Sequence, residues 1–188
     1  FKTSGQVQYV AQNGNFRKKG LEYTGALEIL KVILSYDYLW INLRVKGGAY
    51  GCMSGFKRNG ESLLVSYRDP HLKRTLEVYQ GVPDYIRAFE ADEREMTKYI
   101  IGTISNKDVP RTPQMQGSIS KTAYFSNVTE DMLQKERNQI LGAQKEDIQK
   151  LAALVEAVLS DDQICVVGSE TAIEKAEDVF MEVKPLIG

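Results

Sequence analysis

The chain has 188 residues, which fits one large globular domain or two very small ones, and is long enough to bury about 70% of the surface that its unfolded form exposes. Hydrophobic residues make up 43% of it and charged residues 26%, which disfavours disorder, collagen-like repeats and coiled coils. The formal net charge of −1 indicates neither a nucleic-acid-binding protein nor a strongly anion-seeking surface.

The first predicted element is a strand near the start of the chain. Val7, Tyr9 and Ala11 alternate with glutamines, which predicts a half-buried strand that ends at the Asn13-Gly14 turn. Residues 21–43 then carry apolar side chains on nearly every face, which predicts a long helix with a wide buried stripe.

Glycines mark the next two boundaries. Gly47-Gly48 should end the long helix, because glycine readily takes the left-handed conformation found at helix ends. The pair Asn59-Gly60 separates two apolar runs at 49–58 and 62–68, which predicts an antiparallel hairpin.

Helices dominate the rest of the chain. Asp69-Pro70 resembles an N-cap followed by proline at the first helical position, and Pro83 should kink or break the helix that follows. Thr129 can cap a later helix through its hydroxyl. The other expected segments are a helix at 96–104, a loop at 108–113 and a short helix at 119–125.

The last part of the chain returns to the sheet. Residues 148–159 form the clearest amphipathic helix, and the apolar run 164–167 predicts a strand covered on both faces. Thr171 and Glu174 could form the capping box of a final helix through Phe180. This order indicates an α+β fold, with an antiparallel-rich sheet and helices packed on one face, in a single domain over residues 1–188.

Few residues suggest chemistry by themselves. His71 is the only histidine and has no partner for a zinc site or a catalytic triad, so we expect a plain surface histidine. Cys52 and Cys165 lie far apart without C-x-x-C spacing, which argues against a disulfide scaffold and favours a reducing compartment. No apolar run approaches the roughly 18 residues of a membrane span.

The densest glycine cluster is Gly47, Gly48, Gly51 and Gly55. Its spacing matches neither of the two common nucleotide-binding fingerprints, so a phosphate-binding loop is a weak alternative. The cluster also runs from a helix into a strand, whereas both fingerprints run from a strand into a helix.

The residues around these glycines carry a resemblance. L-R-V-K-G-G-A-Y-G at 43–51 resembles the helix-to-strand turn in the C-terminal half of insulinase/pitrilysin-type zinc metallopeptidases, and is most similar to the presequence protease subfamily. Y-V-A-Q-N-G at 9–14 and Y-I-I-G-T-I at 99–104, with Asp108 and Pro110, extend the likeness over nearly the whole chain.

The resemblance implies a LuxS/mitochondrial-processing-peptidase-like metallohydrolase fold. Two related halves would enclose a chamber for unfolded peptides, with zinc held in the first half by H-x-x-E-H and a later glutamate. This chain lacks that motif. We therefore expect an N-terminally incomplete C-terminal domain that binds no metal and is inactive alone. Its expected partners are unfolded peptides and the N-terminal catalytic half of the same protein, and we expect it to bind neither nucleic acid nor membrane.

The same resemblance implies a role for Arg44 and Tyr50 in substrate binding at the zinc site of the other half. A guanidinium offers a fork of donors to a peptide carbonyl, and a phenol can hydrogen-bond an oxyanion, at about 2.7 to 4 kcal/mol per well-aimed donor. Gly47, Gly48 and Gly51 would shape the supporting turn. From the residues alone, Arg44 could equally bind carbonyls at a helix end, and Tyr50 could be an ordinary strand aromatic.

Three functional classes remain open from the sequence. The first is the substrate-gripping domain of a zinc endopeptidase. The second is a non-catalytic scaffold or processing-peptidase partner subunit of the same fold, and the third is a stand-alone binding module. The sparse cysteines favour bacterial cytoplasm, with an organellar matrix as the alternative. Cleavage preference and physiological substrate are not encoded in this segment.

Overall fold

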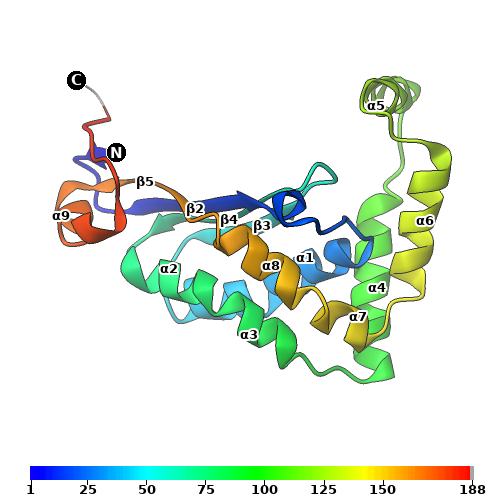
Figure 1. Cartoon of the computed structure of the whole chain (residues 1–188), viewed down its shortest axis with the longest axis horizontal. Helices are drawn as coiled ribbons and strands as arrows, with labels where there is room; N and C mark the ends of the chain where they lie inside the picture. The colour runs from blue at the N-terminus through cyan, green and yellow to red at the C-terminus, as the bar shows by residue number, and fades with distance from the viewer. Residues whose placement is uncertain (187–188) are drawn as a thin grey trace.

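A five-stranded sheet organises residues 1–186, the part of the chain that the computed structural model describes (Figure 1). The strand order is β1-β5-β2-β4-β3, and only the pairing of β1 with β5 is parallel. The strands are β1 (Lys2–Thr3), β2 (Gln8–Asn15), β3 (Gly51–Phe56), β4 (Glu61–Asp69) and β5 (Gln163–Ser169).

Helices cover one face of this sheet, as the sequence predicted. Helix α1 (Ala26–Tyr36) packs on β3, while α2 (Lys73–Gln80) and α8 (Ala152–Leu159) pack on β2. In Figure 1 these helices and α3 (Val82–Arg87) lie together on one side of the strands. The expected α+β fold with one helical layer is therefore confirmed.

The remaining helices surround one end of α1 or follow the strands at the chain ends. Helix α5 projects furthest from the sheet (Figure 1), and none of its residues is buried. The bounds are α4 (Glu93–Lys107), α5 (Pro113–Phe125), α6 (Glu130–Leu141), α7 (Lys145–Gln149) and α9 (Glu170–Glu174), with short turns η1 (Phe16–Lys19), η2 (Trp40–Val45) and η3 (Glu177–Val179).

Strand β2 alternates as predicted, but with its glutamine side buried. Gln8, Val10 and Gln12 face the helices, whereas Tyr9 and Ala11 point to the open side of the sheet. The buried amide of Gln8 is satisfied because its Oε1 accepts the Ser169 N–H at 2.8 Å. Apolar residues of the strand therefore line the face that no helix among residues 1–186 covers.

The strand also continues past the predicted Asn13-Gly14 turn to Asn15. It remains paired because β4 is long enough to place Glu61 opposite Asn15. Gly14 lies against the end of α8, where an added Cβ would be 2.0 Å from the Val158 carbonyl oxygen. The glycine serves close packing there instead of a turn.

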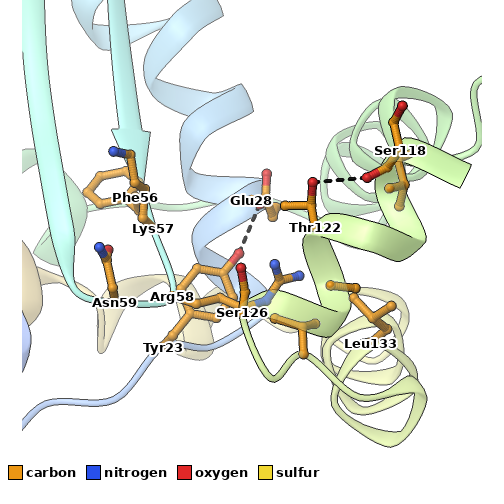
Figure 2. Close-up of a pocket in the computed structure, with 13 residues that line it drawn as sticks. Tyr23, Glu28, Phe56, Lys57, Arg58, Asn59, Ser118, Thr122, Ser126 and Leu133 are labelled. Carbon is orange, nitrogen blue, oxygen red and sulfur yellow. Dashed lines mark hydrogen bonds between the residues drawn. The ribbon is translucent and has the colours of Figure 1, made fainter. Parts of the chain in front are cut away.

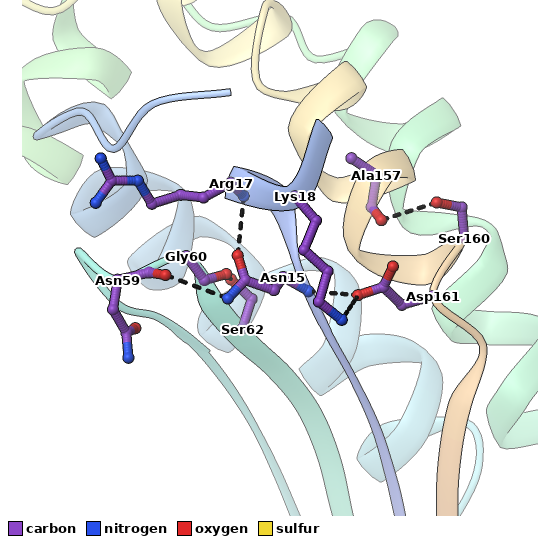
Figure 3. A network of polar contacts seen from close by, with 9 residues as sticks. All are labelled: Asn15, Arg17, Lys18, Asn59, Gly60, Ser62, Ala157, Ser160 and Asp161. Atoms are coloured by element: carbon purple, nitrogen blue, oxygen red, sulfur yellow. Dashed lines mark hydrogen bonds and ion pairs between the residues drawn. The ribbon is translucent and has the colours of Figure 1, made fainter. Parts of the chain in front are cut away.

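A polar network fastens the end of β2 (Figure 3). The Asn15 N–H donates to Asp161 at 2.9 Å, and Lys18 pairs with the same carboxylate at 3.0 Å. The Asn15 side chain donates to the Asn59 carbonyl at 3.2 Å. The hydrogen bonds from Lys18 and Asn15 lower the pKa of Asp161. The network joins the hairpin tip to the α8–β5 connection.

The predicted long helix is interrupted. Helix α1 ends at Tyr36, Asp37 leaves helical geometry, and the chain resumes as the wider π-helical turn η2. The Asp37 carboxylate accepts a hydrogen bond from the Tyr99 hydroxyl on α4, which holds the break in place. The predicted stop at Gly47-Gly48 is confirmed, with Gly48 at φ +80°.

Two predicted helix caps are wrong. Asp69 does not cap a helix directly; it accepts the His71 N–H at 2.9 Å and the Thr75 hydroxyl at 2.7 Å, and α2 begins only at Lys73. Helix α9 begins at Glu170 without a side-chain cap, so the Thr171 and Glu174 capping box does not form. Instead, Glu174 pairs with Lys2 at 2.8 Å.

Other boundaries follow local signals. The Asn59-Gly60 hairpin is confirmed, the chain breaks before Pro83, and the Thr129 hydroxyl accepts the Met132 N–H to cap α6. Three segments differ in extent: the helix expected at 119–125 begins at Pro113, the one at 148–159 is divided between α7 and α8, and the last helix does not continue to Phe180. The strand at 164–167 is covered on one face only, since Val166 is buried and Cys165 is exposed.

Candidate functional site

The bend between η2 and β3 carries the residues that the sequence singles out. The chain reverses after Val45, and the N–H groups of Gly48 and Ala49 donate at 2.9 Å to the carbonyls of Arg44 and Leu43. Gly47 permits this tight return, because an added Cβ would be 2.4 Å from the Leu43 carbonyl oxygen. The bend is thus fixed by backbone hydrogen bonds and leaves nearby side chains free.

Arg44 lies on the exposed side of this bend. Its guanidinium stacks 4.1 Å above the ring of Trp40, one turn earlier on the same segment. Stacking of this kind holds a guanidinium plane while its N–H donors stay available. Burial raises the pKa of the neighbouring Cys52 thiol to about 11, and the positive charge of Arg44 opposes that rise.

Tyr50 also points outward, with 59% of its surface exposed. Its ring lies 5.8 Å from that of Tyr67, and the Arg68 guanidinium is 5.1 Å from its centre. The space over Gly51 is filled by Tyr67, since an added Cβ would be 2.3 Å from the Tyr67 hydroxyl oxygen. Gly51 therefore makes room for an aromatic side chain that supports Tyr50.

Arg44 and Tyr50 share the bend, but among residues 1–186 each side chain stacks on a different neighbour, Arg44 on Trp40 and Tyr50 beside Tyr67. Neither the guanidinium nor the phenol hydroxyl has a hydrogen-bond partner within residues 1–186. The carbonyls at the end of η2 are instead bound by Arg74, which donates to Lys46 at 3.3 Å and Asn42 at 3.5 Å. The helix-end role that the sequence allowed for Arg44 thus belongs to Arg74, which sequence reasoning missed.

A cavity lies elsewhere, between the tip of the β3–β4 hairpin and helix α5 (Figure 2). It has a volume of about 690 Å³ and mostly apolar walls. At its polar edge Arg58 binds Glu136 through two hydrogen bonds of 2.5 and 2.6 Å, and the Tyr23 hydroxyl donates to Glu28 at 2.9 Å. These hydrogen bonds from Arg58 to Glu136 raise the pKa of the guanidinium.

Metal-binding residues do not cluster in the described part of the chain. Among residues 1–186 no three His, Cys, Asp or Glu side chains lie close enough to hold an ion. His71 is exposed, as expected. The residues present therefore do not fit a zinc site.

Over the same residues, no helix is both long and apolar enough to cross a membrane.

Comparison with known proteins identifies related chains. Residues 1–170 match the model of a family described as the PreP C-terminal domain. The chain is 49% identical over 185 residues to "Protein HypA" of Clostridium perfringens, covering 98% of this chain and 19% of that protein. It is 34% identical over 183 residues to "Presequence protease 1, chloroplastic/mitochondrial" of Arabidopsis thaliana, covering 95% and 17%. The chain thus spans less than a fifth of these curated relatives.

Solved structures share the fold at low sequence identity. Pitrilysin superimposes with a TM-score of 0.60 at 15% identity, covering 88% of this chain and 18% of that one. A peptidase M16 inactive domain from Pseudomonas fluorescens gives 0.61 at 20% identity, covering 90% and 42%. At these identities the likeness concerns the fold, which agrees with the α+β layer described above.

Proposed function

The chain belongs to the PreP C-terminal domain family, and from this premise we propose that it is a substrate-binding domain of a zinc metalloendopeptidase that degrades unstructured peptides. In this proposal another part of the same protein holds the zinc ion, and that ion would activate the attacking water. The domain alone is inactive. The 49% identity to a Clostridium perfringens protein and the two distant cysteines support a bacterial cytoplasmic location.

The observation that carries the proposal is a pair of unpartnered donors on one rigid bend. The Arg44 fork is held by stacking on Trp40, and the Tyr50 phenol is held beside Tyr67. A buried donor without a partner would be costly, but these two are exposed and ready for a ligand. In the assembled protein, Arg44 would donate to a carbonyl of the bound peptide, and Tyr50 would donate to the oxygen that becomes negative during hydrolysis.

Substitution in the full-length protein tests this assignment. Arg44→Ala and Tyr50→Phe each remove one donor, so we expect peptide hydrolysis to fall by about 100-fold or more in each variant. Zinc content, measured by atomic absorption, should stay at the wild-type level because no ligand is altered. Unchanged turnover in both variants, or loss of zinc from either, would refute the role.

Two control variants separate this effect from general damage. Arg94→Ala removes an exposed arginine from α4, and Tyr36→Phe removes a phenol that is 71% exposed at the end of α1. Neither residue lies on the bend, so both variants should hydrolyse peptides at the wild-type rate. A fall in these controls equal to that in Arg44→Ala would show that the assay reports folding.

A further inference from the structure

The open face of the sheet, opposite the helices, carries no charged residue over its centre. The outward-pointing residues at its centre are the alternate positions of 9–13, 51–55, 63–67 and 163–167, which contain no Asp, Glu, Lys or Arg. Glu61 also points outward, at the hairpin end of β4, and pairs there with Lys57 at 3.0 Å. Charged residues make up 26% of the whole chain. An antiparallel sheet with one solvated face normally places polar side chains on that face. This face therefore has the composition of a surface that is covered in the assembled protein.

Strand register aligns its centre into one row. Cys165, Ala11, Val65 and Met53 lie side by side across β5, β2, β4 and β3. Met53 is 48% exposed and Cys165 is exposed, so the row is accessible over residues 1–186. The row contains only uncharged side chains, with Ala11 and Val65 in its middle, and we call it the apolar strip.

The sheet preserves this strip at a cost on its other side. Gln8 and Gln12 occupy buried positions of β2, and the Gln12 Nε2 has no hydrogen-bond partner within residues 1–186. Burying an unpaired amide is unfavourable, whereas turning the strand over would bury Tyr9 and Ala11 instead. The arrangement keeps apolar side chains outward, which a contact on that face would explain.

The strip is continuous with the bend that carries Arg44 and Tyr50. Tyr67 belongs to the open face, fills the space over Gly51 and packs beside Tyr50. At this end of the sheet Arg44 and Arg68 stack on aromatic rings. A chain held at the bend can thus extend from polar donors directly onto an uncharged surface.

We infer that the open sheet face binds an uncharged, apolar stretch of the unfolded peptide whose neighbouring residues are held at the bend. This inference rests on the proposed function and adds the class of peptide that the domain selects. The strip offers no charge to pair with a charged side chain, so placing one there would remove it from water without compensation. Peptides with uncharged segments should therefore bind better than those with charges at the same positions.

Alkylation of Cys165 in the full-length protein tests the inference. Zinc is first removed with a chelator so that the protein does not hydrolyse the test peptide, an unstructured peptide with an Ala/Ser/Val centre. Binding of this peptide is followed by fluorescence anisotropy. At about ten times its Kd, the peptide should slow iodoacetamide modification of Cys165 about tenfold by mass action, as measured by mass spectrometry of the Cys165-containing fragment. An analogue with alternating Asp residues should bind more weakly and protect less. Cys52, which faces the helices, serves as the internal reference.

Two outcomes would overturn the inference. If Cys165 is unreactive both with and without peptide, another domain packs on the open face. If Cys165 stays reactive under saturating peptide, the peptide binds elsewhere. Either result leaves the proposed function intact if Arg44→Ala still loses turnover. If Arg44→Ala and Tyr50→Phe both retain turnover, the proposed function itself fails.

A kinetic comparison gives an independent measurement. Val65→Lys places a charge in the centre of the row and should raise KM for the uncharged peptide by about tenfold. Ile101→Lys makes the same kind of change at an exposed position on α4 and should leave KM unchanged. Circular dichroism first establishes that both variants fold. If Val65→Lys does not fold, the alkylation assay on the unaltered protein tests the inference instead. A KM that is equal in the two folded variants would contradict the inference.

Discussion

The ion pair between Arg58 and Glu136 ties the hairpin tip to α6, and removing it should destabilise the domain unequally from its two sides. Glu136 has only 8% of its side chain exposed, whereas Arg58 retains 37%. Two hydrogen bonds of 2.5 and 2.6 Å join them, and the guanidinium lies 5.7 Å from the ring centre of Tyr23. The two partners therefore differ in how easily they can return to water.

The asymmetry sets the expected magnitudes. Breaking a fully buried pair costs about 3–5 kcal/mol, because the remaining charge stays buried. Arg58→Met leaves the Glu136 carboxylate in its buried position, so we expect the lower end of that range, about 3 kcal/mol. Glu136→Gln leaves a guanidinium that can rotate toward solvent, and solvent screening reduces its cost to about 1–2 kcal/mol.

Urea unfolding of the two variants and of the double variant measures these values. The double variant should be more stable than the sum of the single effects predicts, with a coupling free energy of about 2 kcal/mol. The pair Lys57–Glu61 on the same hairpin is the matched control. Its side chains are 64% and 57% exposed, so its double-mutant cycle should show no coupling above the error of the measurement.

Equal destabilisation by Arg58→Met and Glu136→Gln would refute the argument from unequal burial. A coupling energy below about 0.5 kcal/mol would refute the pair itself, since residues that do not interact give additive effects within that margin. The second result would mean that the ion pair does not hold the hairpin tip to α6.

Two further predictions concern stability. Gly14→Ala should lower the free energy of unfolding in urea by more than about 2 kcal/mol, because the new methyl would lie 2.0 Å from the Val158 carbonyl oxygen. The control Gly117→Ala, at an exposed position of α5 with open space around it, should raise the free energy of unfolding by about 0.5–1 kcal/mol. Equal effects of the two substitutions would contradict the close packing at Gly14. Burial raises the pKa of the Cys52 thiol from 9.0 to about 11, so its stabilisation is fully present below pH 9 and is lost as the pH rises toward 11. Over that window the wild type should lose more stability than Cys52→Ala, and parallel losses would rule out a buried thiol.

Signals that act within a few residues were readable from the sequence. The Asn59-Gly60 hairpin, the Thr129 cap and the helix end at Gly48 all depend on backbone conformations that those residue types favour. The motif at 43–51 located the bend for the same reason. How Arg44 and Tyr50 are held could not be predicted, because Trp40 and Tyr67 reach them through a π-helical turn and a cross-strand contact.

Interactions between distant segments were not readable. Arg58 and Glu136 are 78 residues apart, and nothing local to either residue indicates the other. Asp69 was mistaken for a helix cap because Asp-Pro is typical of one. Its carboxylate instead accepts hydrogen bonds from the His71 N–H, two residues before α2, and from the Thr75 hydroxyl in the first turn of α2. Such choices depend on which neighbours the fold supplies.

The inverted strand β2 follows from the same limit. Alternation of apolar and polar residues specifies two faces, and it identifies the buried face only when the other meets water. Here the apolar face carries Tyr9 and Ala11 outward, and the absence of charge around them becomes visible only after register brings Val65, Met53 and Cys165 into the same row. A strand that is apolar on the side away from its own helices is consistent with selection for contact on both sides. The phase of β2 therefore cannot be derived from its alternation alone.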